Sequence, residues 1–579
     1  MNRGSLKFEV SSMGVRACSG GASVLTSRLG VPSFEFQVSS PDAQSGSTES
    51  RPTSASTSAS NWRLGTGNWE LPQPHLRTSS GTLLGLLLAA TVSVSGQDAV
   101  RGEVLARQHC AACHLFPEPD LLDRATWQNH TLRRMAPMLG VARMRTEGRP
   151  DGRRLEESGV FPSSPVLSAE DWAAITTYYV GHAPIEALPA PERKPITAVS
   201  DRFKVEPLTL PSSVPLTTWA KIDEVRREVW LGDAGSGSLV VFGDRGAFLR
   251  RSNLGGAPVH CIPDGDRLLV TLIGSVFPSD VPAGKLVRVG ADGTGEPSAV
   301  IEGLERPVQC LSADLNGDGR RDLLVCGFGN YLGRLAWHER RVDGGYTAHE
   351  LMPKPGAVHA EIRDVDRDGD PDLIVLMAQG REGVFLFENN GKGEFQIRTL
   401  LEFHPAFGSV GFELADMNGD GLEDLILANG DNGEYPSPFK RYHGVRIFVN
   451  DGRYRFTERW FHPVHGAFKV VARDFDGDGD RDLAAISFFP DYAHAAGEAF
   501  VHFENLGGLK FEARTIEGAT RGRWLTMDAG DADGDGDVDI VLGSFIQGPP
   551  AIEIPAGLQN GWRTNGVNAL LLRNRGGKP

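Results

Sequence analysis

The sequence DVDRDGDPDLIV at residues 364–375 carries the pattern that decides the fold. Its acidic residues follow the order D-x-D-x-D-G-x-x-D, and an apolar run comes directly after them. Four further segments repeat it, the first two with Asn in place of the second Asp: DLNGDGRRDLLV from Asp314, DMNGDGLEDLIL from Asp416, DFDGDGDRDLAAI from Asp474 and DADGDGDVDIVLG from Asp531. A single segment of this kind could be an ordinary Asp/Gly turn. Five with the same polar spacing indicate a cation-binding loop that recurs along the chain.

The chemistry of these loops fits calcium. Side-chain oxygens at positions 1, 3, 5 and 9, with the carbonyl of position 7, can surround a hard cation, and glycine at position 6 permits the sharp turn. The loops differ from an EF-hand because position 12 lacks Glu and the flanks read as strands. We therefore predict up to five Ca²⁺ ions, with side-chain ligands Asp314, Asn316, Asp318, Asp322, Asp364, Asp366, Asp368, Asp372, Asp416, Asn418, Asp420, Asp424, Asp474, Asp476, Asp478, Asp482, Asp531, Asp533, Asp535 and Asp539.

The spacing of the loops predicts a β-propeller. Successive loops begin 50, 52, 58 and 57 residues apart, which is the length of a propeller blade. Each repeat places a strand, the Asp loop, an apolar strand, a variable loop and an aromatic strand that ends in an Asn/Gly turn. This grammar resembles FG-GAP/VCBS repeats, the calcium-loop blades of integrin-alpha-like propellers and many secreted bacterial proteins.

Two units without a complete Asp loop, Trp219–Val241 and Val259–Val289, bring the expected number of blades to seven. Phe203–Leu210 should pair with the last blade and close the ring, so the propeller is expected over 201–579. The variable loops should lie on the face opposite the calcium loops. Equivalent positions on the inner strands carry His260, Gln309, His359 and Lys469, which we expect around the central channel.

A second chemical motif precedes the propeller: Cys110-Ala111-Ala112-Cys113-His114. In CxxCH two thiols bond to the haem vinyl groups and the adjacent imidazole binds the iron. The alternatives are a thioredoxin-like CxxC, which needs a βαβ setting, and half of a zinc site, which needs a second Cys/His pair nearby. The sequence offers neither, and we predict one covalent haem c.

The flanks of this motif resemble a class I cytochrome c, which implies a small all-α domain, expected here over 98–186. Helices are predicted over Gly102–His109 and Ser168–Val180. For the sixth iron ligand we prefer Met135. Met138 and Met144 are alternatives, and His130 is a less favoured candidate. The four prolines between Pro184 and Pro195 predict a spacer, placed at 187–200.

The beginning of the chain predicts secretion. The apolar run Leu83–Val94 follows Arg77 and precedes small residues, so we predict a signal peptide over 76–97 and no transmembrane span after its cleavage. Residues 1–75 are rich in Ser, Thr, Gly and Pro, which predicts disorder and suggests a start codon assigned too early. The expected location is the periplasm, the cell surface or the medium.

Charge and cysteine content narrow the function. The net charge of −15 argues against nucleic acid, and 18 of the 20 calcium-ligand side chains are carboxylates. The six cysteines imply no disulfide framework.

The first hypothesis is an electron-transfer protein whose propeller binds a redox partner protein or a small-molecule substrate. The second is a haem oxidoreductase with its substrate site on the propeller, and the third is an adhesion protein with a sensory haem. No residue is predicted to be catalytic, and an electron carrier is favoured over a self-contained enzyme.

Overall fold

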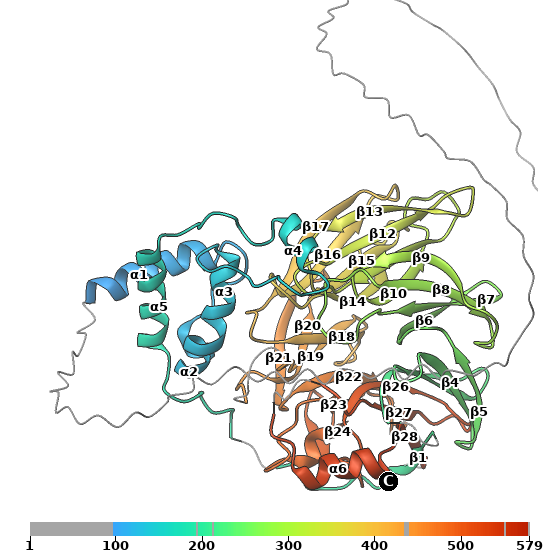
Figure 1. Cartoon of the computed structure of the whole chain (residues 1–579). Helices are drawn as coiled ribbons and strands as arrows, with labels where there is room; N and C mark the ends of the chain where they lie inside the picture. The colour runs from blue at the N-terminus through green and yellow to red at the C-terminus, as the bar shows by residue number, and fades with distance from the viewer. Residues whose placement is uncertain (1–95, 193–194, 211–213, 434–438, 549–551, 577–579) are drawn as a thin grey trace, which may run out of the picture. The chain divides into compact units, whose positions relative to one another are not determined.

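The computed structural model describes residues 96–192, 195–210, 214–433, 439–548 and 552–576. The expectations for residues 1–75 and for nearly all of the signal segment fall outside them. A helical segment comes first, and 28 strands follow (Figure 1). The helices are α1 (Gly96–Cys110), the 3₁₀ turn η1 (Pro119–Leu121), α2 (Arg124–Thr126), the π turn η2 (Trp127–Thr131), α3 (Leu132–Met138), α4 (Gly152–Ser158), α5 (Ala169–His182), the 3₁₀ turn η3 (Ala496–Ala499) and α6 (Ala556–Asn565).

The strands form seven antiparallel four-stranded sheets, so the seven-bladed all-β propeller is confirmed. Blades 1 to 3 are β2 (Thr217–Asp223), β3 (Glu228–Asp233), β4 (Ser238–Gly243) and β5 (Phe248–Asn253); β6 (Pro258–Asp264), β7 (Arg267–Leu272), β8 (Gly284–Gly290) and β9 (Ser298–Leu304); and β10 (Pro307–Ala313), β11 (Asp322–Gly327), β12 (Arg334–Arg340) and β13 (Tyr346–Met352). Blades 4 and 5 are β14 (Ala357–Arg363), β15 (Asp372–Met377), β16 (Gly383–Asn389) and β17 (Phe395–Glu402); and β18 (Ser409–Ala415), β19 (Asp424–Asn429), β20 (Gly444–Asn450) and β21 (Phe456–Pro463). Blades 6 and 7 are β22 (Ala467–Arg473), β23 (Asp482–Ser487), β24 (Phe500–Asn505) and β25 (Phe511–Arg514); and β26 (Trp524–Gly530), β27 (Asp539–Ser544), β28 (Ala569–Asn574) and β1 (Phe203–Leu208).

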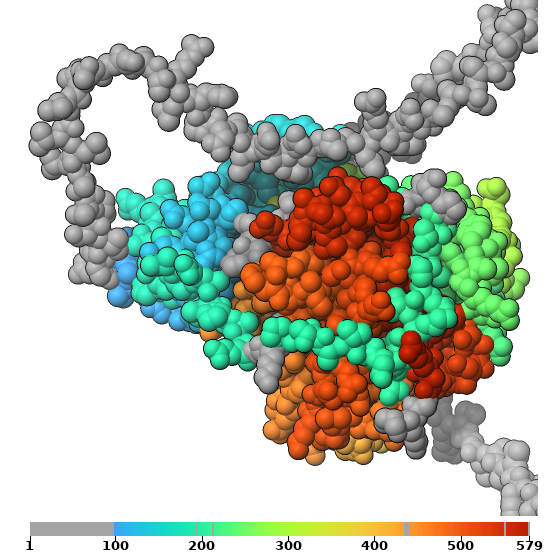
Figure 2. Space-filling model, turned by 90° about the horizontal axis from the view of Figure 1, so that it is seen from below, coloured from blue at the N-terminus to red at the C-terminus, as the bar shows by residue number. Residues whose placement is uncertain are grey.

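The ring closes as the sequence predicted. Strand β1 pairs antiparallel with β28, from Phe203 opposite Asn574 to Leu208 opposite Ala569. In Figure 2 teal residues from the start of the propeller accordingly lie against the red C-terminal residues. This pairing satisfies the backbone groups of β28, which would otherwise form an exposed sheet edge. The two units without complete Asp loops form blades 1 and 2.

The core of the propeller lies between adjacent blades. The apolar run after each Asp loop forms the second strand of its blade, and all six residues of β11, β15, β19, β23 and β27 are buried. Such runs are apolar on both faces because a neighbouring blade covers each side.

The helical segment, residues 96–186, is organised by the packing of α1 against α5. Ser168 caps α5 as expected, since its hydroxyl accepts a hydrogen bond from the Asp171 amide at 3.0 Å. A Cβ atom on Gly102 of α1 would lie 2.1 Å from the Ala174 carbonyl oxygen, so only glycine permits this approach. Among the described residues, no helix is long and apolar enough to cross a membrane.

Candidate metal and cofactor centres

The two motif cysteines lie at the end of α1. Cys110 is its last residue, and the turn that follows is closed by the Cys113 amide and the Cys110 carbonyl at 3.4 Å. Cys110 is half-buried, Cys113 is exposed, and both thiols are free. Burial raises the pKa of the Cys110 thiol, while a hydrogen bond with Tyr179 opposes the shift. Two unpaired thiols one turn apart are the donor set that covalent haem attachment requires.

His114 is held in the form that a metal ligand needs. Its Nδ1 atom lies 2.9 Å from the Leu115 carbonyl oxygen, which can only accept a hydrogen bond, so Nδ1 carries the proton. The lone pair of the imidazole is therefore on Nε2. Burial lowers the pKa of His114. A backbone carbonyl that fixes the tautomer is the usual support of a metal-bound histidine, so the residues present fit a haem iron.

Aromatic side chains fix the loop that follows the motif. Tyr179 of α5 donates to the Pro117 carbonyl at 3.0 Å, and the Trp127 indole donates to the Pro119 carbonyl at 2.8 Å. The two rings stack with centroids 4.3 Å apart. Tyr179 also contacts Cys110, a contact that the sequence pattern does not reveal because the two residues are far apart in the chain.

The structure leaves the sixth-ligand prediction open. Met135 and Met138 are both half-buried on α3, and Met144 is half-buried beyond its end. His130 is half-buried in η2, where burial and then the charges of Arg134 and Arg133 lower its pKa. Met135 stays the preferred candidate on the sequence grounds alone.

The five Asp loops share one geometry. In each loop the position-1 carboxylate accepts the amide of the position-6 glycine at 2.7 to 3.2 Å. The position-5 carboxylate accepts the amide of position 7 at 2.9 to 3.0 Å. Every position-6 glycine has positive φ, from 82° for Gly319 to 100° for Gly479. Each loop therefore turns its carboxylates inward around one point.

Three of the loops bring carboxylate oxygens within 4.8 Å of one another: Asp364, Asp366 and Asp372; Asp474, Asp476 and Asp482; and Asp531, Asp533 and Asp535. In the loops from Asp314 and Asp416, position 3 is asparagine. The Asn418 amide donates to Asp420 at 3.0 Å, and Asp318 forms an ion pair with Arg320. Oxygen clusters of this spacing suit a calcium-sized cation.

The carboxylate at position 9 of the Asp loop also has a structural role, which sequence reasoning missed. Asp372 is fully buried and accepts the amides of Val365 and Asn389, each at 2.8 Å. The Asn389 side chain in turn donates to the Leu315 carbonyl of the preceding blade at 3.0 Å and to the Pro371 carbonyl at 3.1 Å. In the sequence Asn389 is part of an Asn/Gly turn, and in the structure it joins two blades and anchors the Asp loop.

The predicted channel residues occupy equivalent positions, because each follows a register shift at the start of its inner strand. Their surroundings differ. The Gln309 side chain bonds to both backbone groups of Ala360. Burial, then the charges of His359 and Lys469, lower the pKa of His260 to about 3, so these side chains share one environment. No three residues here form a metal-type cluster among the described parts of the chain.

The variable loops serve two purposes. Phe488, Phe489, Tyr492, Phe545 and Trp562 pack together in one buried cluster, so these aromatics stabilise the loops themselves. Tyr435 lies outside the described residues. The β19–β20 loop instead meets the helical segment, with which it shares one compact unit: the Tyr442 hydroxyl donates to the Leu121 carbonyl at 3.1 Å, and Arg441 pairs with Asp120 at 2.7 Å.

Comparison with known proteins supports the repeat assignment. The FG-GAP-like repeat family matches residues 314–375 and 364–427, so the chain contains FG-GAP repeats. A T-cell immunomodulatory protein homolog of Plasmodium falciparum (isolate 3D7) is 28% identical over 141 residues, which are 22% of this chain and 19% of the relative. The match thus spans about a fifth of that relative.

Two solved structures resemble the chain at low identity. A streptogramin B lyase has a TM-score of 0.41 at 11% identity, covering 64% of this chain and 97% of the lyase. The hydrazine synthase of Kuenenia stuttgartiensis has a TM-score of 0.39 at 12% identity, covering 58% of this chain and 95% of the synthase chain.

Proposed function

We propose that this chain is a secreted c-type cytochrome that transfers electrons through one haem attached to Cys110, Cys113 and His114. The observation that carries the proposal is the state of His114. Its Nδ1 atom is engaged by the Leu115 carbonyl, and two free thiols lie within the preceding turn. A haem held there would supply reversible one-electron chemistry. The protein orients the imidazole through Leu115 and shields it by burial.

The propeller is proposed as the module that binds the redox partner, a protein or a small molecule. Propellers are common protein-binding modules, and FG-GAP propellers are typically extracellular or on the cell surface, which agrees with the expected secretion. We further propose that up to five Ca²⁺ ions occupy the Asp loops and stabilise the ring. Crowded carboxylates repel one another without a cation, so part of the binding free energy would stabilise the fold.

One observation favours the second candidate, an oxidoreductase with a substrate site on the propeller. Arg523 is 2% exposed and stacks on Phe488 at 3.8 Å, yet its Nη2 atom has no hydrogen-bond partner among the described residues. The buried Tyr492 hydroxyl nearby also lacks one. Buried donors without acceptors suit an oxygen-bearing substrate.

The haem proposal is tested by producing the protein in a host that attaches haem c. We expect one haem per chain, measured from the pyridine haemochrome spectrum of the denatured, acid-extracted protein. Cys110→Ala with Cys113→Ala should abolish covalent attachment, while Cys261→Ala, a change to another half-buried free thiol, should leave it intact. Haem that stays attached in the double variant would contradict the proposal.

Redox titration tests the sixth-ligand proposal and also distinguishes the alternative functions from one another. Met135→Ala should lower the potential, because a thioether ligand raises it, whereas Met138→Ala should not. A bound quinone or flavin spectrum in the purified protein would favour the oxidoreductase. A haem that cannot be reduced reversibly would leave only the sensory or adhesive role.

A further inference from the structure

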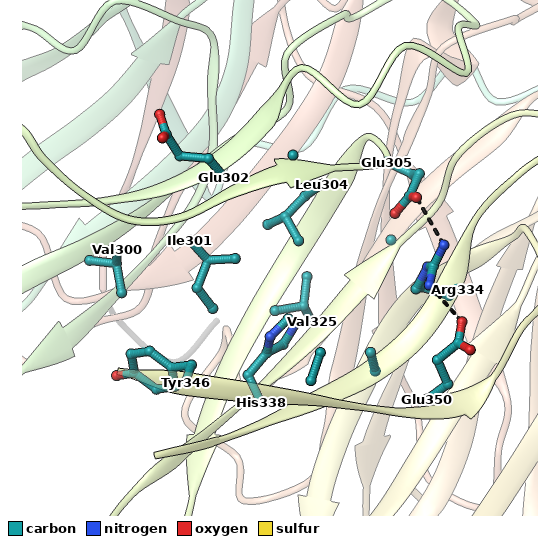
Figure 3. Close-up of a pocket in the computed structure, with 14 residues that line it drawn as sticks. Val300, Ile301, Glu302, Leu304, Glu305, Val325, Arg334, His338, Tyr346 and Glu350 are labelled. Atoms are coloured by element: carbon teal, nitrogen blue, oxygen red, sulfur yellow. Dashed lines mark hydrogen bonds and ion pairs between the residues drawn. The ribbon is translucent and has the colours of Figure 1, made fainter. Parts of the chain in front are cut away.

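A pocket of about 400 Å³ opens between blades 2 and 3 (Figure 3). Its lining comes from β9 on one side and from β11, β12 and β13 on the other. Apolar side chains, among them Val300, Ile301 and Val325, form walls around His338. None of the lining residues belongs to the proposed haem or calcium centres.

The pocket exists because this blade interface is poorly filled. The buried apolar cluster between blades 2 and 3 contains five of the described residues, whereas the cluster between blades 3 and 4 contains 13. Glu302, Ala348 and Glu350 in the lining are exposed, so the space is an open cleft at the outer strands of the two blades.

The cause of the poor filling is the sequence of β12. The β-ladder places His338 opposite Leu323, as it places Phe387 opposite Leu373 in blade 4. The same position holds Phe448 in blade 5 and Phe503 in blade 6. Two residues earlier, Ala336 takes the place of Phe385. Side chains two apart point to the same face of a strand, so both exchanges empty the face that meets blade 2.

The exchanged residues leave polar groups facing this space. His338 is 7% exposed, burial lowers its pKa to about 4, and no side-chain hydrogen bond given for the described residues involves its imidazole. Arg334 bonds through its terminal nitrogens to Glu305 at 3.0 Å and to Glu350 at 2.6 Å. Its Nε atom is buried and has no hydrogen-bond partner among the described residues. The neutral His338 imidazole thus offers this space an N–H group that a ligand can bond.

The charged side chains of the pocket indicate which kind of ligand it can bind. The acidic side chains of Glu302, Glu305 and Glu350 line the same pocket, against Arg334 among the lining residues and Arg154, which pairs with Glu305 from outside the lining. A carboxylate ligand would meet this excess of negative charge, whereas a neutral carbonyl would not.

We propose that the pocket between blades 2 and 3 binds a small neutral molecule carrying an amide or similar carbonyl group. The apolar body fills the space left at Ala336, and the carbonyl accepts a hydrogen bond from the imidazole N–H of His338. The volume lies in the range of small-molecule sites. This proposal is independent of the haem and of calcium.

Benzamide tests the proposal, with benzoate and toluene as probes that change the charge or remove the acceptor. Titration calorimetry and ligand-observed NMR on the full chain should detect benzamide binding, with a dissociation constant of about a millimolar or below. Benzoate and toluene should each bind about tenfold more weakly or not at all. Ala336→Phe restores the side chain of blade 4 and should reduce benzamide affinity by at least about tenfold.

Thr347→Phe is the matched control, because Thr347 is exposed and adjacent residues of β13 point to opposite faces. It should leave benzamide binding unchanged. Binding that is equal in the wild type and Ala336→Phe, or no binding of benzamide to the wild type at millimolar concentration, would overturn the proposal. If Ala336→Phe does not fold, His338→Phe decides instead: lost binding supports the site and unchanged binding refutes it.

Discussion

Replacement of Gly102 by alanine should loosen the contact between α1 and α5. The added Cβ would lie 2.1 Å from the Ala174 carbonyl oxygen and 2.9 Å from Tyr178 Cβ. A carbon and a carbonyl oxygen normally stay about 3.3 Å apart, so the helices must separate by about 1 Å. Overpacking of this kind costs about 1–3 kcal/mol, and the better helix propensity of alanine returns about 0.5–1 kcal/mol. The expected net loss is about 1–2 kcal/mol.

Hydrogen exchange of the amides of α1 and α5 measures this loss locally. A free-energy change of this size should lower their protection roughly 5- to 30-fold, while the propeller amides keep theirs. Gly181→Ala is the matched control, because its Cβ would meet nothing within 4 Å in the same pair of helices. It should leave protection unchanged or raise it. Equal protection in the two variants would refute the packing argument.

Four further predictions concern the propeller. Chelation of calcium by EDTA should lower its melting temperature in a calorimetric scan and leave a haem c spectrum intact, and an unchanged melt would contradict the calcium proposal. Asn389→Ala leaves two carbonyls without their donor and should cost about 2–4 kcal/mol in urea unfolding, against under about 1 kcal/mol for Asn390→Ala, whose side chain bonds to exposed Glu394 and to the amide of exposed Lys392. Arg367 has a φ of 66° where four loops have glycine, so Arg367→Gly should stabilise by roughly 1 kcal/mol rather than destabilise. Burial raises the pKa of Glu382 to about 8, so the native state binds the extra proton and stability falls as pH rises from about 4.3 to 8; Glu382→Gln should flatten this decline in melting temperature.

The architecture of the propeller was predictable because its signals are local and repeated. The Asp loops, the apolar second strands and the blade period each lie within one stretch of about fifty residues. The closing strand was found in the same way, since Phe203–Leu208 repeats the pattern of the other outer strands. Local propensity and the global fold agree in these elements.

Features that depend on neighbouring blades were not predicted. The bond from Asn389 to Leu315 joins residues 74 positions apart, and the pattern of the turn alone does not show it. His338 stands where β16 has Phe387, but the sequence alone does not show that the two positions correspond. The β-ladder establishes which residues of β12 and β16 are equivalent.

The order of loops along each blade places different kinds of loop on the two faces of the ring. The Asp loops connect first to second strands and variable loops connect second to third strands, so the two sets lie at opposite ends of each blade that carries an Asp loop. The contacts of Tyr442 and Arg441 with Leu121 and Asp120 come from a variable loop and reach the segment just after the CxxCH motif. Under the proposed function, a partner that binds near the β19–β20 loop would be held close to the residues that orient His114.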